Sequence, residues 1–215
     1  MRAIIITTFA LFLLQLWGCT EESSKAPAER RTETAAETQE EGNIQEPETE
    51  ETPLTAEKRV ELALGVRDKE ISLADWKTAK IATSKGTFVM EFYVENAPNT
   101  IKNFIRLAQV GFYDGLTFHR YVPDFVVQGG DPRGDGTGDA GYNVDAEFNE
   151  RKHVTGTVAM ARSRDPNSAS CQFYVTLSPK PHLDGNYTVF GQVIEGMEVV
   201  NQLRAGDIIK TITIE

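Results

Sequence analysis

The chain has 215 residues, a formal net charge of −10 and two cysteines. This length suits a single domain with additional segments, and two cysteines exclude a fold held together by several disulfides. The acidity is concentrated: residues 20–57 hold twelve glutamates and three basic residues, whereas the chain from Lys58 onward has 18 basic and 20 acidic residues. The charge therefore belongs to one segment, and no nucleic-acid partner is expected.

The first 18 residues have the pattern of an export signal. Arg2 precedes an apolar stretch from Ala3 to Leu14, which is shorter than the about 20 residues of a transmembrane helix. The stretch ends in Leu16-Trp17-Gly18-Cys19, which resembles the lipobox of bacterial lipoproteins, where the cysteine becomes the lipid-modified first residue. We expect residues 1–18 to be a lipoprotein signal peptide and Cys19 to be lipidated. An ordinary cleaved signal with a chance cysteine is the alternative.

Residues 19–57 are predicted to be a disordered acidic tether that starts at the lipidated Cys19. Apart from Ile44 and Leu54 they offer little apolar surface, so burial cannot offset the entropy cost of ordering them. A flexible chain of this length spans roughly 30–35 Å, which would hold a domain away from a membrane. We expect an extracytoplasmic protein, lipid-anchored to a bacterial membrane on its periplasmic side. The outer membrane is favoured, because Thr20 is not the aspartate that resembles an inner-membrane retention signal.

A lead-in segment at residues 58–77, with a weak helical pattern, precedes a β-rich domain at residues 78–215. Alternating apolar residues and turn signals indicate the strands. A helix is predicted from Pro98 to a stop at Gly111, and a second one from Glu195 to Leu203. The predicted strands are Lys80–Thr83, Thr87–Val94, Thr117–Tyr121, Phe125–Gly129, Gly156–Ala161, Gln172–Thr176, Thr188–Val193 and Ile208–Ile214. Many short strands with few helices indicate a closed barrel or a sandwich.

The glycine-rich loop Gly129–Gly138 is interpreted as structural. A phosphate site would need the loop to open a helix, and no clear helix follows. A calcium loop would carry acidic residues at every second position, whereas these aspartates are four apart. The histidines also lack the spacing of zinc ligands, so no metal site is predicted; they are His119, His153 and His182.

Two segments carry a resemblance to a known family. The first is Phe118 to Asp131, with the sequence FHRYVPDFVVQGGD, and the second, Gln172 to Gly191, contains QFYV, LDG and VFG. Together they resemble the cyclophilins, the family of peptidyl-prolyl cis-trans isomerases, over about Lys80 to Glu215. The resemblance implies a mainly β fold: a closed eight-stranded antiparallel barrel capped by two helices.

The resemblance also implies an enzyme that accelerates rotation about Xaa-Pro bonds without a cofactor or metal. Because an export signal is predicted, we expect its substrates to be exported or envelope proteins. This rotation is slow because the nitrogen lone pair is delocalised into the carbonyl. A fixed donor to the prolyl nitrogen would bind the twisted state better than the planar one, and an always-charged, rigid guanidinium suits this task.

Arg120 is therefore the expected catalyst, with Phe125 and Gln128 beside it. The expected partners are proline-containing polypeptides, and we expect a monomer. The substrate-binding residues that the resemblance implies are Met160, Ala161, Arg162, Gln172, Tyr174, Leu183 and Tyr187.

Tyr174 and His119 carry expectations of their own. Tyr174 stands where many relatives have phenylalanine, which adds a hydroxyl at the floor of the proline pocket. His119 alternates with Arg120 along one strand, so it is expected to face the other side and to be structural.

The same groove would also serve a membrane-tethered chaperone or scaffold that binds proline-containing segments without essential turnover. The presence of Arg120 favours the enzyme, because a pure binder could dispense with it.

Overall fold

The structure is a computed structural model that describes residues 53–215. The predicted signal peptide, the lipidated Cys19 and the tether up to residue 52 lie outside the described residues. Among residues 53–215, no helix combines the length and the apolar character needed to cross a bilayer.

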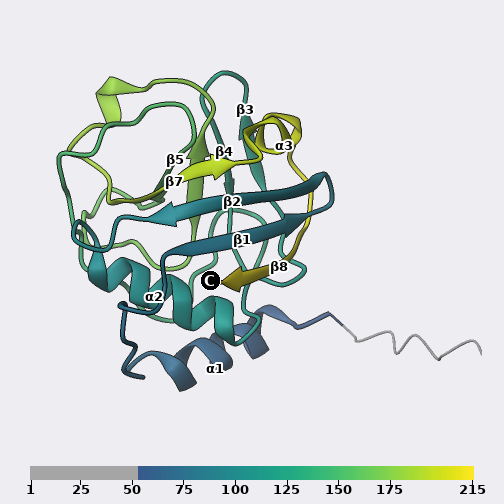
Figure 1. The fold of residues 1–215 in the computed structure, drawn as a ribbon. Coiled ribbons are helices and arrows are strands. Elements are labelled where there is room, and N and C mark those ends of the chain that lie inside the picture. The colour runs from purple at the N-terminus through teal and green to yellow at the C-terminus, as the bar shows by residue number, and fades with distance from the viewer. Residues whose placement is uncertain (1–52) are drawn as a thin grey trace, which may run out of the picture. The chain divides into compact units, whose positions relative to one another are not determined.

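Eight strands and three α-helices follow one another in the described part of the chain (Figure 1). The strands and the second and third helices match the predicted set, with boundaries that differ by a few residues. The helices are α1 (Ala56–Val66), α2 (Pro98–Gln109) and α3 (Met197–Gln202), and a short 3-10 helix spans Pro181–Leu183. The strands are β1 (Thr78–Thr83), β2 (Gly86–Phe92), β3 (Arg120–Val122), β4 (Val126–Gly129), β5 (Thr157–Met160), β6 (Phe173–Thr176), β7 (Val189–Glu195) and β8 (Ile209–Ile214).

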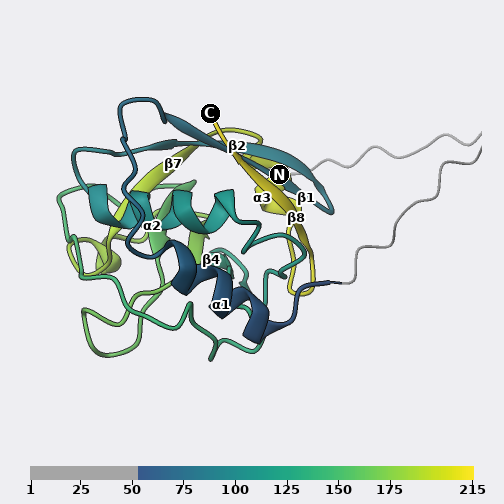
Figure 2. The same ribbon diagram turned by 90° about the horizontal axis from the view of Figure 1, so that it is seen from below.

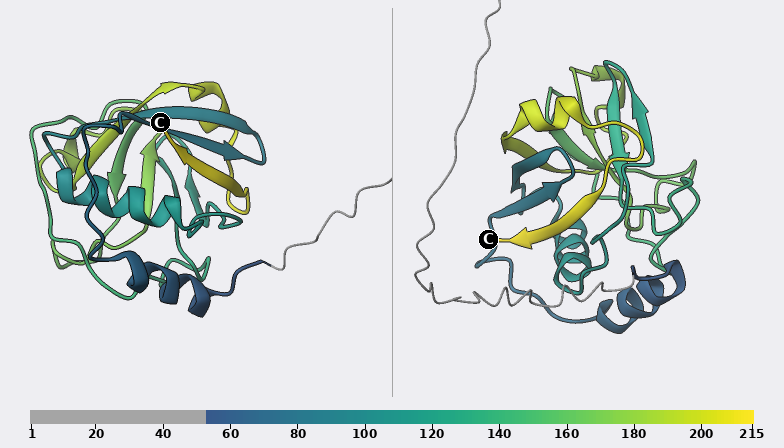
Figure 3. Two further views of the ribbon diagram at one scale, coloured as in Figure 1. Left: turned by 60° about the horizontal axis from the view of Figure 1, so that its bottom comes forward. Right: turned by 90° about the vertical axis from the view of Figure 1, so that its right-hand side faces the viewer.

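The strands form one antiparallel sheet in the order β3-β4-β6-β5-β7-β2-β1-β8. The register shifts in three of the pairs, between β1 and β8, β2 and β7, and β5 and β7. Such irregularities bend a strand and increase its twist. The sheet therefore curls strongly (Figure 3).

The curled sheet is an open half-barrel, so the predicted closure of the barrel is wrong. Strands β3 and β8 are its two edges. Four backbone hydrogen bonds connect residues 115–118 to residues 206–209, among them Phe118 N to Asp207 O at 2.8 Å, around the single bridge between Thr117 and Ile208. Strand β3 begins only at Arg120 and has three residues, so these contacts do not extend into a ladder.

Helices α2 and α3 lie on opposite sides of β1 and β2 (Figures 1 and 3). In α2, the buried side chains of Ile101, Phe104, Ile105 and Ala108 recur at helical spacing and face the core. The helix ends before Gly111, whose φ of 68° is the left-handed conformation typical of a helix end.

The amino-terminal end of α2 is held by a distant carboxylate. Pro98 occupies the first turn, and the preceding Ala97 offers no side-chain cap. Instead the carboxylate of Glu147 accepts hydrogen bonds from the backbone N–H groups of Asn99 at 3.0 Å and Thr100 at 2.8 Å. These are free amides of a first helical turn, where a negative charge is also favourable.

The core lies between the curled sheet and α2. Phe104 is at its centre, with ring centroids 5.2 Å from Tyr113, 5.6 Å from Phe173 and 5.4 Å from Phe190. A smaller apolar cluster lies on the other face of the sheet. Its buried members are Val126, Ala159, Tyr174, Leu183 and Val189.

The weak helical pattern of the predicted lead-in segment corresponds to α1, which begins at Ala56 rather than within residues 58–77. Thr55 caps it by accepting a hydrogen bond from the Lys58 N–H. Figure 2 shows α1 next to α2. The contact is secured by Arg59, which is 2% exposed and donates to the carbonyl oxygens of Leu54, Gly111, Phe112 and Asp114.

Candidate active site

The hairpin of β3 and β4 presents three of the predicted residues together. Its turn is closed by the Phe125 N–H, which donates to the Val122 carbonyl at 3.1 Å. Pro123 fits the second position of such a turn, and Asp124, with a φ of 55°, takes the left-handed third position that aspartate tolerates. This turn sets the register that places Arg120 opposite Gln128.

Arg120 is held beside an apolar ring by a neutral partner. Its Nη1 donates to Gln128 Oε1 at 3.2 Å, and its guanidinium carbon lies 5.8 Å from the centroid of the Phe125 ring. The side chain is exposed, so its remaining donors are free to meet a ligand.

These residues border a pocket of about 180 Å³. Apolar and aromatic side chains line most of it, with the guanidinium groups of Arg120 and Arg162 beside them. The lining residues are Arg120, Phe125, Val126, Gln128, Ala161, Arg162, Tyr174, Leu183 and Tyr187. The structure thus brings eight of the predicted site residues to one pocket, and it adds Val126.

Met160 does not line this pocket. It is 2% exposed and belongs to the main core, whereas its neighbour Ala159 belongs to the small cluster with Tyr174. Successive side chains of a strand point to opposite faces of the sheet, so β5 turns Ala159 and not Met160 toward the pocket side.

Gln172 lies in an adjoining pocket of about 360 Å³ that shares Gln128, Ala161 and Arg162 with the first one. Gln128 Nε2 donates to Gln172 Oε1 at 2.9 Å. Gln172 Nε2 donates in turn to the carbonyl oxygens of Gly138 at 2.8 Å and Gly136 at 3.2 Å. A chain of hydrogen bonds thus runs from Arg120 to the glycine-rich loop.

The glycine-rich loop is organised by its own aspartate. The side chain of Asp131 is fully buried and accepts hydrogen bonds from the backbone N–H groups of Arg133, Asp135 and Gly136. The loop forms one wall of the larger pocket. Its geometry fits the predicted structural role beside the groove.

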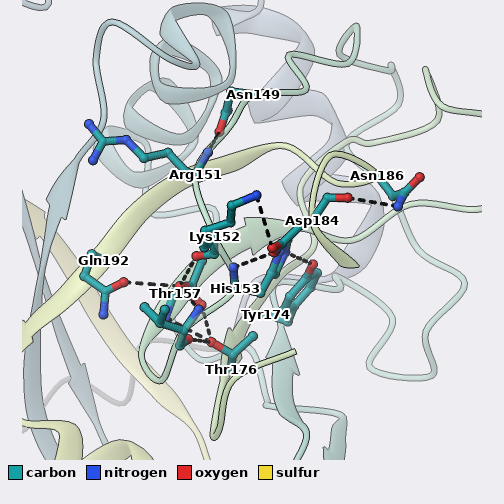
Figure 4. A network of polar contacts seen from close by, with 11 residues as sticks. Asn149, Arg151, Lys152, His153, Thr157, Tyr174, Thr176, Asp184, Asn186 and Gln192 are labelled. Carbon is teal, nitrogen blue, oxygen red and sulfur yellow. Dashed lines mark hydrogen bonds and ion pairs between the residues drawn. The ribbon is translucent and has the colours of Figure 1, made fainter. Parts of the chain in front are cut away.

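A buried polar network lies behind the pocket wall (Figure 4). His153 Nε2 is 2.9 Å from the Tyr174 hydroxyl, and His153 Nδ1 is 3.1 Å from Asp184 Oδ1. Burial lowers the pKa of His153, although the Asp184 carboxylate opposes this shift. Burial also raises the pKa of Tyr174 well above its ordinary value.

The sequence does not indicate this network. His153 is 21 residues from Tyr174 and 31 from Asp184 in the chain, and no local pattern links the three. His119, the histidine next to the expected catalyst, has both ring nitrogens buried without a hydrogen-bond partner among the described residues. Burial lowers its pKa.

Comparisons with known proteins point to one family. The family model described as cyclophilin type peptidyl-prolyl cis-trans isomerase/CLD matches residues 78–214. A peptidyl-prolyl cis-trans isomerase of Synechococcus elongatus is 47% identical over 138 residues, which cover 63% of this chain and 94% of the relative. Peptidyl-prolyl cis-trans isomerase B of Bacillus subtilis is 46% identical over 127 residues, covering 58% and 88%.

Solved structures agree with this assignment. A crystal structure of a Cryptosporidium parvum cyclophilin type peptidyl-prolyl cis-trans isomerase has a TM-score of 0.62 at 32% identity, covering 65% of this chain and 98% of that one. A second structure of that protein, in the presence of the dipeptide Ala-Pro, has a TM-score of 0.61 at 34% identity, covering 65% and 99%. With the curled sheet and the pocket beside Arg120, these matches show that the chain belongs to the family of cyclophilin-type peptidyl-prolyl cis-trans isomerases.

Proposed function

We propose that this chain catalyses the cis-trans isomerisation of Xaa-Pro bonds, with Arg120 as the catalytic donor. The observation that carries the proposal is a guanidinium fixed by Gln128 at a pocket of about 180 Å³ whose lining includes the apolar side chains of Phe125 and Leu183. The proline ring would enter the pocket, and the free N–H groups of Arg120 would meet the prolyl nitrogen. The presence of an Ala-Pro dipeptide in a related structure supports a ligand of this class.

The rate gain follows from the charge that appears during rotation. As the peptide bond twists, its lone pair becomes localised on the prolyl nitrogen, which then accepts a hydrogen bond that the planar amide cannot accept well. A donor already in place needs no reorganisation at that moment. Gln128 contributes by fixing the guanidinium, and Phe125 by covering one side of the ring.

The test is an isomerase assay of the full chain on a proline tetrapeptide. The variant Arg120→Ala should lower kcat/KM by at least about tenfold, since deletion of one transition-state donor elsewhere costs about 100- to 1000-fold. Arg67→Ala is the matched control: Arg67 is an exposed arginine paired with Asp68 outside the pocket, and its loss should leave kcat/KM unchanged.

Unchanged activity in Arg120→Ala would refute the role of this guanidinium. A wild type that binds proline peptides without turnover would instead indicate the membrane-tethered chaperone or scaffold.

We further propose that the enzyme acts on exported or envelope proteins while anchored through a lipid on Cys19. The support comes from the sequence: a short apolar stretch after Arg2, the lipobox-like end at Cys19 and an acidic segment before Pro53. A single lipid chain binds membranes only marginally, so stable anchoring of this chain needs a lipid with more than one acyl chain or a second membrane-binding signal.

Membrane fractionation of cells that express the chain tests this setting. Wild type should sediment with the membranes and show the mass of attached lipid, whereas Cys19→Ser should be soluble or remain uncleaved. Cys171→Ser is the matched control, because Cys171 is buried in the core and should not affect fractionation. Equal membrane association of wild type and a cleaved Cys19→Ser, or a wild type without the mass of attached lipid, would contradict the anchor.

A further inference from the structure

Three walls of the proline pocket come from two separate segments of the chain. Tyr174 comes from β6, while Leu183 ends the 3-10 helix and Tyr187 lies in the segment that follows it. His153 connects these segments, although it does not line the pocket. It is 1% exposed and lies just before β5, between Asp184 and Tyr174 (Figure 4).

The partners of His153 fix the direction of its hydrogen bonds. The Asp184 carboxylate only accepts, so His153 Nδ1 carries the hydrogen across the 3.1 Å contact. Asp184 Oδ1 also accepts from the His153 backbone N–H at 2.8 Å. His153 Nε2 is therefore the acceptor, and the Tyr174 hydroxyl donates to it across 2.9 Å.

The rings of His153, Tyr174 and Tyr187 pack against one another in the orientation that these hydrogen bonds hold. The Tyr174 ring meets Tyr187 edge to face, with centroids 5.8 Å apart at an interplanar angle of 84°. His153 also meets Tyr187 edge to face, at 6.4 Å and 80°. His153 thus supports both tyrosines from behind, and Asp184 ties it to the segment that carries Leu183 and Tyr187.

Each polar atom in this array depends on the others. Tyr174 is 5% exposed, so its hydroxyl would be left without an acceptor if His153 were apolar. A buried polar group without a partner is unfavourable, and the side chain moves if it can. Lys152 lies on the outer side of Asp184, with Nζ 3.5 Å from Oδ2.

We propose that His153 is a positioning residue that sets the depth of the proline pocket through the Tyr174 hydroxyl, and so sharpens the selectivity of the site for the five-membered ring of proline. This inference rests on the proposed function of the pocket. A pocket of fixed depth rejects an imino acid with one more methylene, and one methylene is worth about 10–200-fold in an apolar site. A pocket floor that can shift discriminates less between rings of five and six members.

The experiment compares two tetrapeptides that differ only in the imino acid, proline or pipecolate, whose ring has six members. The readout is the ratio of kcat/KM for proline to kcat/KM for pipecolate, measured with the full chain. This ratio does not depend on the fraction of folded enzyme, so a merely structural role of His153 would leave it unchanged.

Wild type should prefer proline by at least about tenfold. Tyr174→Phe, which keeps the ring and removes one oxygen, should lower the ratio at least threefold, and so should His153→Phe. The double variant should fall no further than the stronger single one, because each substitution breaks the same hydrogen bond. The matched control is Tyr142→Phe: this hydroxyl donates to Asn103 Oδ1 at 2.6 Å outside the pocket, and its loss should leave the ratio at the wild-type value.

A wild-type ratio in Tyr174→Phe would overturn the inference, and so would additive losses in the double variant. If His153→Phe does not fold, Tyr174→Phe decides alone. These results differ from failure of the proposed function, which would appear as unchanged activity in Arg120→Ala or as an inactive wild type. An inactive wild type would overturn both proposals.

Discussion

Arg120 and Gln128 show how far a single side chain can be located from local sequence. Their pairing follows from a turn of four residues whose proline and aspartate fit the positions they occupy. Ala159 and Met160 show the limit, since a shift of one residue along β5 exchanges the pocket side for the core. The family motifs were sufficient to predict which strands line the pocket. They did not predict which face of the sheet each side chain takes, because this depends on packing in the folded chain.

The role of His153 could not be predicted from the sequence for a related reason. Its partners are brought together by the pairing of β5 with β6 and by the return of the chain at Asp184. No local pattern encodes a contact that only the completed sheet creates. Tyr174, where many relatives have phenylalanine, was the one signal in the sequence that a polar contact lies behind the pocket. It did not indicate which residue accepts the hydrogen bond of its hydroxyl.

The buried state of His153 predicts a pH dependence of stability. Its pKa is lowered in the folded chain, whereas an unfolded chain keeps a value of about 6.5. As the pH falls through 6.5, the unfolded state takes up the proton first, so the folded state loses stability. The loss is about 1.4 kcal/mol for each unit by which the pKa is lowered.

Urea unfolding at pH 7.5, 6 and 5 measures this effect as a difference between wild type and His153→Phe. The difference in the free energy of unfolding should shrink toward pH 5, because only wild type carries the titrating group. The pKa of Asp184 is lowered as well, first by the His153 backbone N–H, so this carboxylate stays ionised over the range. A difference that is constant with pH would contradict the prediction.

Among the elements, α2 combines local and distant determinants. Pro98, the buried face of the helix and Gly111 are local signals, and they were sufficient to predict its course. Its amino-terminal cap is not local, because Glu147 is 48 residues from Asn99 and 47 from Thr100. The helix could be predicted, and the residue that completes its first turn could not.

Removal of this cap should destabilise the protein. Glu147→Ala leaves the Asn99 and Thr100 N–H groups without their carboxylate, and we expect a loss of about 0.5–2 kcal/mol, the range for lost helix caps. Denaturant unfolding measures it. Glu150→Ala is the control, since Glu150 is exposed nearby and should change the free energy of unfolding by less than about 0.5 kcal/mol. Equal values for both variants would exclude a capping role.

At the scale of the whole molecule, the strand set and the helices were predictable, whereas the opening of the sheet was not. Closure of the sheet into a barrel depends on how many residues pair between its two edges, β3 and β8. The edges meet only near the single bridge between Thr117 and Ile208, which no sequence pattern predicts. Helix α1 also lies outside the matched family segment of residues 78–214. Its docking depends on Arg59, a basic residue in a segment with a weak pattern.

Two shortened chains separate the contributions of α1 and the segment before it. A chain that begins at Pro53 should keep the wild-type free energy of unfolding and kcat/KM, because α1 and the pocket remain. A chain that begins at Lys77 loses Arg59 and the buried Ile71, and should be less stable by at least about 2 kcal/mol. Thermal unfolding and the isomerase assay measure both, and equal stability of the two chains would show that α1 contributes nothing.

The anchorage of Arg59 has a mechanical consequence. Tension applied to the chain at Pro53 is delivered first to α1, and from there through the guanidinium to the turn formed by Gly111, Phe112 and Asp114. Along the backbone, the load meets this junction before it reaches Arg120 or any later residue of the pocket. A load applied at the leading end of the domain is thus borne by the contacts of Arg59 before it reaches the residues that line the pocket.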